Sequence, residues 1–134
     1  MKVIDGAGAT LGRLASYAAK ESLKGEEISI INCENVIITG NFESIKRDFE
    51  EQRGRVGSGQ KGPKHHATSE KIVKRTIRGM LPDARMGRGK IAFQKIRCYS
   101  KVPKELESSK ALKISEDKKK KYSEVKNFTK NKLN

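Results

Sequence analysis

The sequence predicts an α/β fold, a three-layer α/β/α sandwich built around a small, mainly parallel sheet of about four strands. Three observations support this prediction. Segments with strand and helix periodicity follow one another in the order strand, helix, strand, strand, helix. The runs at 28–31 and 36–39 are almost continuously apolar, which is typical of strands covered on both faces. The chain has 134 residues, the length of one domain with a single core.

The first strand and the first helix have the clearest pattern in the chain. Residues 2–5 form a short strand-like run that ends at Gly6. Residues 10–24 are expected to form a helix, with Thr10 as its N-cap and Gly25 just beyond its end. Apolar side chains recur along this helix at helical spacing and form one stripe, made of Leu11, Leu14, Ala15, Ala18, Ala19 and Leu23.

Two strands and a second helix complete the first half of the chain. The strands at 28–31 and 36–39 are separated by a turn over 32–35. Asn41 is expected to cap a helix that runs to about Arg53 and carries its apolar residues on one side. A capping side chain of this kind accepts a hydrogen bond from a backbone amide of the first helical turn.

A loop and a third helix are predicted next. Residues 54–68 contain four glycines, one proline and no apolar periodicity, so we expect them to form a basic loop. Ser69 is expected to cap a helix that ends near Arg78, because Gly79 and Pro82 terminate it.

The last part of the chain has weaker signals. A basic turn is expected over 85–89, followed by a short helix over 90–96 and a final strand over 97–99. The stretch 106–134 is rich in lysine and has few apolar residues. We expect it either to form a helix that docks on a partner or to be frayed.

Positive charge is concentrated in the middle of the chain. The formal net charge is +14 in total, and it divides into −2 for residues 1–53, +12 for 54–104 and +4 for 105–134. We therefore expect one α/β domain over 1–103, whose region 54–104 binds RNA, and a basic extension over 104–134. A one-sided concentration of lysine and arginine is the expected footprint of a nucleic-acid partner.

Several other classes of protein are disfavoured. No apolar run approaches the roughly 18 residues of a membrane span, and no secretory signal is visible, so a cytoplasmic location is expected. Cys33 and Cys98 form no CxxC pair, and we expect both to be reduced core residues. Adjacent His65 and His66 point in opposite directions in an extended chain and have no cysteine nearby, so no metal site is expected. No nucleophile–base pair is apparent, and we expect no catalytic residues, no cofactor and no enzymatic activity.

Two glycine patterns resemble nucleotide-binding motifs. Gly6, Gly8 and Gly12 follow a strand and open a helix, where backbone amides attract phosphate. A small nucleotide-binding enzyme is therefore an alternative function, but the chain lacks a second half to close a dinucleotide crevice. We favour glycines that allow a tight turn and close packing. The literal G-x-G-x-x-G at 57–62 follows no strand, so we interpret it as a loop whose backbone can approach phosphate or sugar.

The basic residues from 71 to 104 are interleaved with small and apolar ones, which places cations beside a core. Arginine suits RNA because its planar guanidinium contacts phosphate bidentately and stacks on exposed bases. The candidate RNA-binding residues are Arg13, Arg53, Arg55, Lys61, Lys64, His65, His66, Lys74, Arg75, Arg78, Arg85, Arg88, Lys90, Lys95 and Arg97.

Three blocks of sequence resemble a known family. They are DG at 5–6 with LGRLAS at 11–16, VIITGN at 36–41, and RGMLP at 78–82 followed by GR at 87–88. In this order they resemble the universal large-subunit ribosomal protein thirteen family over about residues 2–103. The short form with PKHH at 63–66 is similar to the archaeal and eukaryotic branch, and its compact length to the archaeal side.

The resemblance implies an α/β/α core with a small, mainly parallel sheet and no catalytic role. It implies a structural constituent of the large ribosomal subunit, which binds large-subunit ribosomal RNA and supports subunit assembly and translation. The expected partners are that RNA and neighbouring ribosomal proteins, with no membrane and no isolated homo-oligomer. An RNA-binding regulator of translation outside the ribosome would use the same basic surface and stays open as an alternative.

Overall fold

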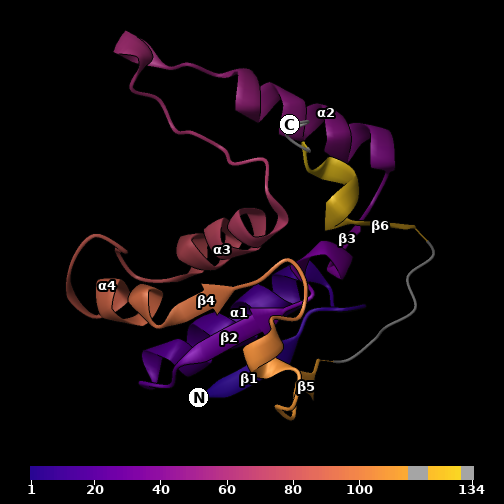
Figure 1. Ribbon diagram of the computed structural model, residues 1–134. Coiled ribbons are helices and arrows are strands. Elements are labelled where there is room, and N and C mark those ends of the chain that lie inside the picture. The colour runs from indigo at the N-terminus through magenta and orange to yellow at the C-terminus, as the bar shows by residue number, and fades with distance from the viewer. Residues whose placement is uncertain (115–120, 131–134) are drawn as a thin grey trace.

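A four-stranded parallel sheet lies at the centre of the computed structural model, which describes residues 1–114 and 121–130 (Figure 1). The strand order is β4–β2–β1–β5, and every neighbouring pair is parallel. The strands are β1 (Lys2–Asp5), β2 (Ile28–Ile31), β4 (Ile96–Cys98) and β5 (Leu112–Lys113). The first two match the predicted bounds, and β4 begins one residue earlier than predicted.

Three helices cover one face of this sheet. They are α1 (Leu11–Leu23), α3 (Ser69–Met80) and α4 (Gly87–Gln94). The predicted apolar stripe of α1 is largely buried, and its alanines allow close helix packing. Fully buried isoleucines of the strands complete the core; they are Ile4, Ile28, Ile30 and Ile96. The predicted α/β class with a mainly parallel sheet of four strands is confirmed.

The other face of the sheet has a thinner cover. Val3 and Ile31 alternate along their strands with core residues, so they point to the opposite face, where Leu106 packs on them. Leu106 belongs to the short 3-10 turn η3 (Lys104–Leu106). The layer on this face is therefore an irregular segment rather than a full helix.

The third predicted strand does not join the central sheet. β3 (Ile37–Thr39) pairs antiparallel with β6 (Tyr122–Glu124), and an isolated bridge between Thr10 and Ile37 links it to the start of α1. The chain leaves the main sheet through the 3-10 turn η1 (Cys33–Asn35), which follows Asn32 in a left-handed conformation with φ of 56°. This turn redirects the backbone after β2.

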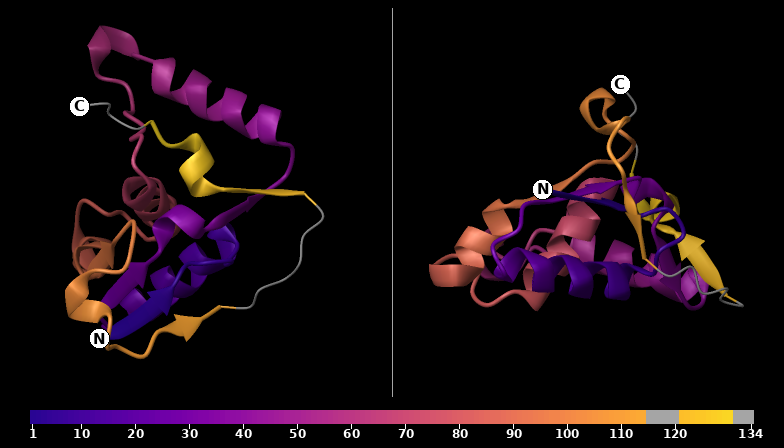
Figure 2. Two further views of the ribbon diagram at one scale, coloured as in Figure 1. Left: turned by 45° about the vertical axis from the view of Figure 1, so that its right-hand side comes forward. Right: turned by 90° about the horizontal axis from the view of Figure 1, so that it is seen from below.

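Helix α2 (Phe42–Gly54) stands apart from the central sheet (Figures 1 and 2). The Asn41 cap is confirmed, since its side-chain oxygen accepts a hydrogen bond from the Glu43 amide at 2.9 Å. None of the α2 residues is buried, and the apolar side of the helix faces the C-terminal segment. Phe42 and Phe49 stack on Phe128, with ring centroids 5.4 and 5.2 Å away.

The C-terminal stretch contains no helix longer than a 3-10 turn in its described residues, in contrast to the docking helix that we considered. It forms β5, β6 and the turn η4 (Val125–Phe128), and Val125 and Phe128 are buried. The parts of that prediction at 115–120 and 131–134 lie outside the described residues. The yellow segment in Figures 1 and 2 runs beside α2. Its apolar residues pack on the folded chain itself.

Several helix ends differ from the predictions. Thr68, not Ser69, precedes α3, and the Ser69 hydroxyl donates to the Ser100 hydroxyl at 2.9 Å rather than capping the helix. Thr10 precedes α1 but makes no capping bond with its side chain. α3 continues through Gly79 to its end, and α4 starts at Gly87 rather than at residue 90. No helix in the described part of the chain has the length and apolar character that a membrane crossing requires.

Candidate nucleic-acid interface

Helix α3 carries basic side chains next to a buried apolar side. Ile72, Val73 and Ile77 are buried against the core, which fixes the rotation of the helix about its axis. Lys74 and Arg75 lie beside them and are half-buried, whereas Arg78 is exposed. Because the apolar residues lock the helix, the cations are held at defined positions on the surface.

A basic hollow of about 410 Å³ lies between α3, α4 and the loop before α3. It is lined by His66, Lys71, Lys74, Arg75, Arg78, Ala84 and Phe93. Four of these, His66, Lys74, Arg75 and Arg78, are predicted site residues. Lys71 is a further cation that was not predicted. Its i, i+3 and i, i+4 spacing to Lys74 and Arg75 indicates a shared helix face. The Lys74 ammonium lies 4.9 Å from the centroid of the Phe93 ring, a cation–π distance. We refer to this site as the cationic hollow.

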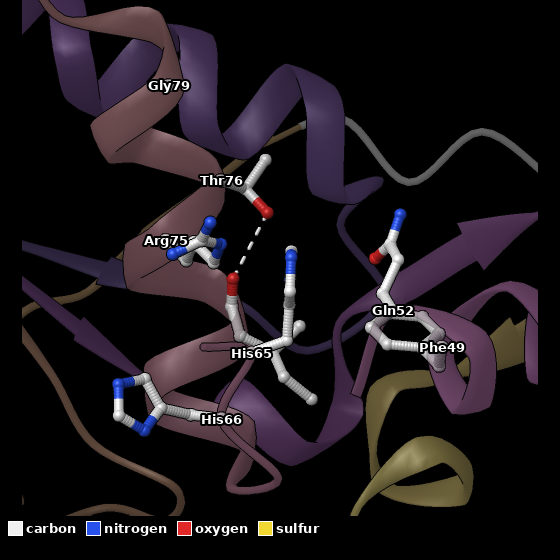
Figure 3. Close-up of a pocket in the computed structure, with 8 residues that line it drawn as sticks. Phe49, Gln52, His65, His66, Arg75, Thr76 and Gly79 are labelled. Carbon is white, nitrogen blue, oxygen red and sulfur yellow. Dashed lines mark hydrogen bonds between the residues drawn. The ribbon is translucent and has the colours of Figure 1, made fainter. Parts of the chain in front are cut away.

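A second hollow of about 290 Å³ adjoins the cationic hollow and shares His66 and Arg75 with it (Figure 3). The other lining residues are Phe49, Gln52, His65, Ile72, Thr76 and Gly79. The Thr76 hydroxyl donates to the Ile72 carbonyl at 3.1 Å, the dashed line in Figure 3. Most of the lining side chains end in a planar group, namely an aromatic or imidazole ring, an amide or a guanidinium, so we call this second site the planar hollow.

The two histidines face different surroundings. His66 is exposed and borders both hollows, while His65 is half-buried. Burial lowers the pKa of His65, and the positive charges of Arg75, Arg53 and Arg55 lower it further. The lowered pKa disfavours the charged form of the His65 ring. Among the residues that the structure describes, no group of three or more His, Cys, Asp and Glu gathers that could hold a metal ion.

The predicted cations at the end of α2 are engaged within the protein. Arg53 donates a hydrogen bond to the Phe128 carbonyl, and its guanidinium lies 5.3 Å from the Phe49 ring centroid. Burial lowers the pKa of Arg53. Arg55 forms an ion pair with Glu51 at 2.8 Å. These contacts hold the C-terminal segment and the start of the loop, so both arginines have partners within the protein.

The turn between α3 and α4 presents three predicted cations, Arg85, Arg88 and Lys90, all exposed. Asp83 shapes the turn by accepting a hydrogen bond from the Arg85 amide at 3.0 Å. Gly89 is buried against the backbone of this turn: a Cβ atom there would lie 2.1 Å from the Pro82 carbonyl oxygen. The close approach sets where the cations on either side of Gly89 are displayed.

The remaining predicted residues lie elsewhere. The Lys95 ammonium donates to the Gly25 carbonyl at 3.0 Å, and Lys95 and Arg97 line a separate hollow at the β4 edge of the sheet. Arg13 is exposed on α1, and Lys61 and Lys64 are exposed in the loop before α3. The structure thus places these five apart from the cationic hollow.

The glycines at 57–62 close this loop on itself. The Gly62 amide donates to the Val56 carbonyl at 3.0 Å, and a Cβ on Gly57 would lie only 2.3 Å from the Gly62 Cα. Gly57 also has a positive φ of 76°. The glycines therefore allow two segments of the loop backbone to pass close to each other. They do not precede an α-helix directly, as a dinucleotide-binding motif does.

The turn between β1 and α1 has its amides occupied by the protein. The Ala7 amide donates to an Asp5 carboxylate oxygen at 3.0 Å, and the amides of Gly8 and Ala9 donate to the carbonyls of Asn35 and Gly6 at 3.1 Å. A Cβ on Gly6 would lie 2.8 Å from a Val36 methyl group. The turn is thus closely packed, as the interpretation of tight turning predicts, and these three amides are not available to a phosphate.

Cys33 and Cys98 form no disulfide in the structure. Cys33 is buried and Cys98 is half-buried. A hydrogen bond with Cys98 and burial both raise the pKa of the Cys33 thiol, so the reactive thiolate is disfavoured. The two residues serve as small parts of the core.

Comparison with known proteins identifies the family. Residues 1–105 match the family described as Ribosomal protein L13. The chain is 44% identical over 114 residues to the large ribosomal subunit protein uL13 of Thermoplasma acidophilum, covering 85% of this chain and 82% of that protein. It is 45% identical over 109 residues to the uL13 of Methanocaldococcus jannaschii, covering 79% of each chain. It is 43% identical over 117 residues to the uL13 of Methanosarcina barkeri, covering 87% of this chain and 82% of that protein.

These relatives share a family of structural ribosomal proteins and not of enzymes, which confirms the prediction that the chain has no enzymatic role. The blocks at the turn before α1, at β3 and at the end of α3 all lie within the matched residues. The match and the fold agree with the resemblance seen in the sequence. The chain belongs to the ribosomal protein L13 family.

Proposed function

We propose that this protein is a structural component of the large ribosomal subunit in the cytoplasm, where it binds large-subunit ribosomal RNA and supports subunit assembly. The observation that carries the proposal is the cationic hollow. Lys71, Lys74, Arg75 and Arg78 lie there with His66. RNA phosphates provide the negative charge that such a cluster needs, because affinity for nucleic acid comes largely from phosphate neutralisation.

The proposed mechanism is a clamp without turnover. The α3 cations contact phosphates, and the exposed side chains of Arg85, Arg88 and Lys90 extend the basic surface beyond the hollow. Ribose 2′-hydroxyls next to the backbone accept and donate further hydrogen bonds, which favours RNA over DNA. Within the basic region 54–104, the RNA-binding surface in this account is formed by α3, α4 and the turn between them, and Lys104 lies outside it, in η3 on the other face of the sheet. Neighbouring ribosomal proteins are expected to contact the remaining surface, including the extension over 104–134.

A double substitution tests the function. Arg78→Ala with Arg88→Ala removes two exposed cations of the proposed surface, and because both side chains are exposed the fold is expected to persist. Each lost phosphate contact contributes roughly 1 kcal/mol or more, so affinity for a large-subunit ribosomal RNA fragment is expected to fall about tenfold to a hundredfold.

The matched control is Lys104→Ala with Lys110→Ala, which removes the same charge from the segment that covers the other face of the sheet. Binding is measured by filter retention or fluorescence anisotropy, with circular dichroism to establish folding. The proposal predicts a large loss for the first pair and a small loss for the control. Equal losses for the two pairs, or no loss for either, would contradict the proposed surface.

A further inference from the structure

The planar hollow and the cationic hollow adjoin each other, and we treat them as two halves of one site that differ in their chemistry. His66 and Arg75 line both halves. The cationic half contains the charged groups of Lys71, Lys74 and Arg78 in addition. The planar half instead contains the ring of Phe49, the imidazole of His65 and the primary amide of Gln52. A ligand that spans both halves therefore needs a flat, polar-edged group joined to an anion.

The planar half has the groups that hold a nucleobase. Figure 3 shows the His65 side chain between Arg75 and the pair formed by Gln52 and Phe49. The imidazole rings and the Arg75 guanidinium can stack on a base, and a side-chain amide offers a donor and an acceptor to a base edge. The Phe49 ring already contacts Phe128 and Arg53, so it forms an apolar wall of the hollow. Gln52 is exposed on α2, which leaves its amide accessible at the rim. The His65 ring adds a further stacking surface on this side of the hollow.

The position of the planar hollow beside the cations favours an unpaired nucleotide. A base within an RNA duplex is stacked and paired, so it can enter a recess on the protein only when it leaves the duplex. The recess adjoins the cations, because His66 and Arg75 border both halves.

We propose that this site binds a single unpaired RNA nucleotide, with the base in the planar hollow and the adjoining phosphates in the cationic hollow. The inference rests on the proposed function, since it names the RNA element that the same surface selects. In this arrangement α2 reads the base and α3 holds the backbone. The C-terminal segment supports the base side, because Phe128 packs on Phe49 and the Lys130 amide donates to the Ala67 carbonyl at 3.1 Å.

The test compares RNA hairpins of the same stem with the full chain. One hairpin is fully paired, and the other carries a single bulged 2-aminopurine, whose fluorescence falls when the base stacks. We expect the bulged hairpin to bind about tenfold more tightly, consistent with the stacking of one base on an aromatic surface, and its fluorescence to change on binding. Gln52→Ala and His66→Ala are each expected to remove most of this preference, whereas the control Lys104→Ala preserves it.

The outcomes separate this inference from the proposed function. If both hairpins bind equally and the fluorescence is unchanged, the protein binds paired backbone only, and the nucleotide site is wrong while RNA binding stands. If the bulge is preferred but Gln52→Ala and His66→Ala leave the preference intact, the base lies elsewhere, and the assignment to the planar hollow is overturned. If neither hairpin nor any large-subunit RNA fragment binds, the proposed function itself fails.

Discussion

The closest backbone approach near the proposed interface lies at Gly89, and it gives a quantitative prediction. A Cβ atom added there would lie 2.1 Å from the Pro82 carbonyl oxygen and 2.6 Å from that of Asp83. A van der Waals contact needs about 3.5 Å, so Gly89→Ala must move α4 or the preceding turn by more than about 1 Å. Overpacking of this kind costs about 1–3 kcal/mol, and the better helix propensity of alanine offsets at most about 1 kcal/mol.

We therefore expect Gly89→Ala to lower the free energy of unfolding by about 1–2 kcal/mol and the melting temperature by several degrees, on the order of 3–8 °C. The displacement also moves Arg88 and Lys90, so RNA affinity is expected to fall even where the protein remains folded. Urea denaturation and thermal melting measure the first effect, and RNA titration of the folded protein measures the second.

Gly12 provides the matched control. It also lies in a helix, but a Cβ there would meet nothing within 4 Å. Gly12→Ala is expected to raise the free energy of unfolding by about 0.5–1 kcal/mol, because alanine loses less backbone entropy than glycine in a helix. If Gly89→Ala proves as stable as Gly12→Ala, the close packing of α4 on the turn is refuted as the reason for glycine at this position.

Two further substitutions test other parts of the fold. Phe128→Ala removes the ring that stacks on Phe42 and Phe49 of α2, and we expect it to lower the free energy of unfolding by about 2–4 kcal/mol. Amide hydrogen exchange is expected to increase in α2 and the following loop more than in the central sheet. An equal increase throughout the protein would contradict a local role. Hydrogen bonds from Lys2 and Lys24 lower the pKa of Glu21 to about 2 from 4.5, so its charged form stabilises the fold above pH 4.5, and this contribution is lost as the pH falls toward 2. Glu21→Gln is expected to flatten the loss of stability across that window in urea unfolding, and an unchanged acid limb would oppose the assignment.

The local elements of the fold follow from the sequence because their signals are local. The bounds of β1 and β2, the apolar stripe of α1 and the Asn41 cap all depend on residues within a few positions of one another. Hydrophobic periodicity and capping chemistry report such short-range structure directly.

The elements that differ are set by distant partners. β3 is apolar enough for a central strand, yet it pairs with β6, which lies more than 80 residues later. β5 has two residues and no strand pattern, and it exists through its pairing with β1. The C-terminal stretch has few apolar residues, but two of them, Val125 and Phe128, are buried on the domain. Such pairings leave no periodic signal in the chain.

The candidate site also has a part that the sequence predicts and a part that depends on distant contacts. Charge distribution and glycine content predict the basic region, but they do not indicate which cations share one hollow. The fold brings His66 beside Arg75 and Arg78, and it separates Lys95 and Arg97 from them. The placement of Gln52 and Phe49 next to His65 requires α2 to pack near the loop before α3, a contact that only the folded chain creates.

The central claim, that the α3 surface neutralises RNA phosphates, is tested most directly by the salt dependence of binding to a large-subunit ribosomal RNA fragment, with a nonspecific duplex as the reference. Contact with about six phosphates predicts a log–log slope of about −4 for single-stranded RNA and a steeper one for a duplex. The Arg78→Ala with Arg88→Ala variant is expected to reduce this slope by between about one and two, while the Lys104→Ala with Lys110→Ala variant leaves it unchanged. A shallow slope, or one that responds equally to both pairs, would show that the cations around α3 are not the RNA-binding surface.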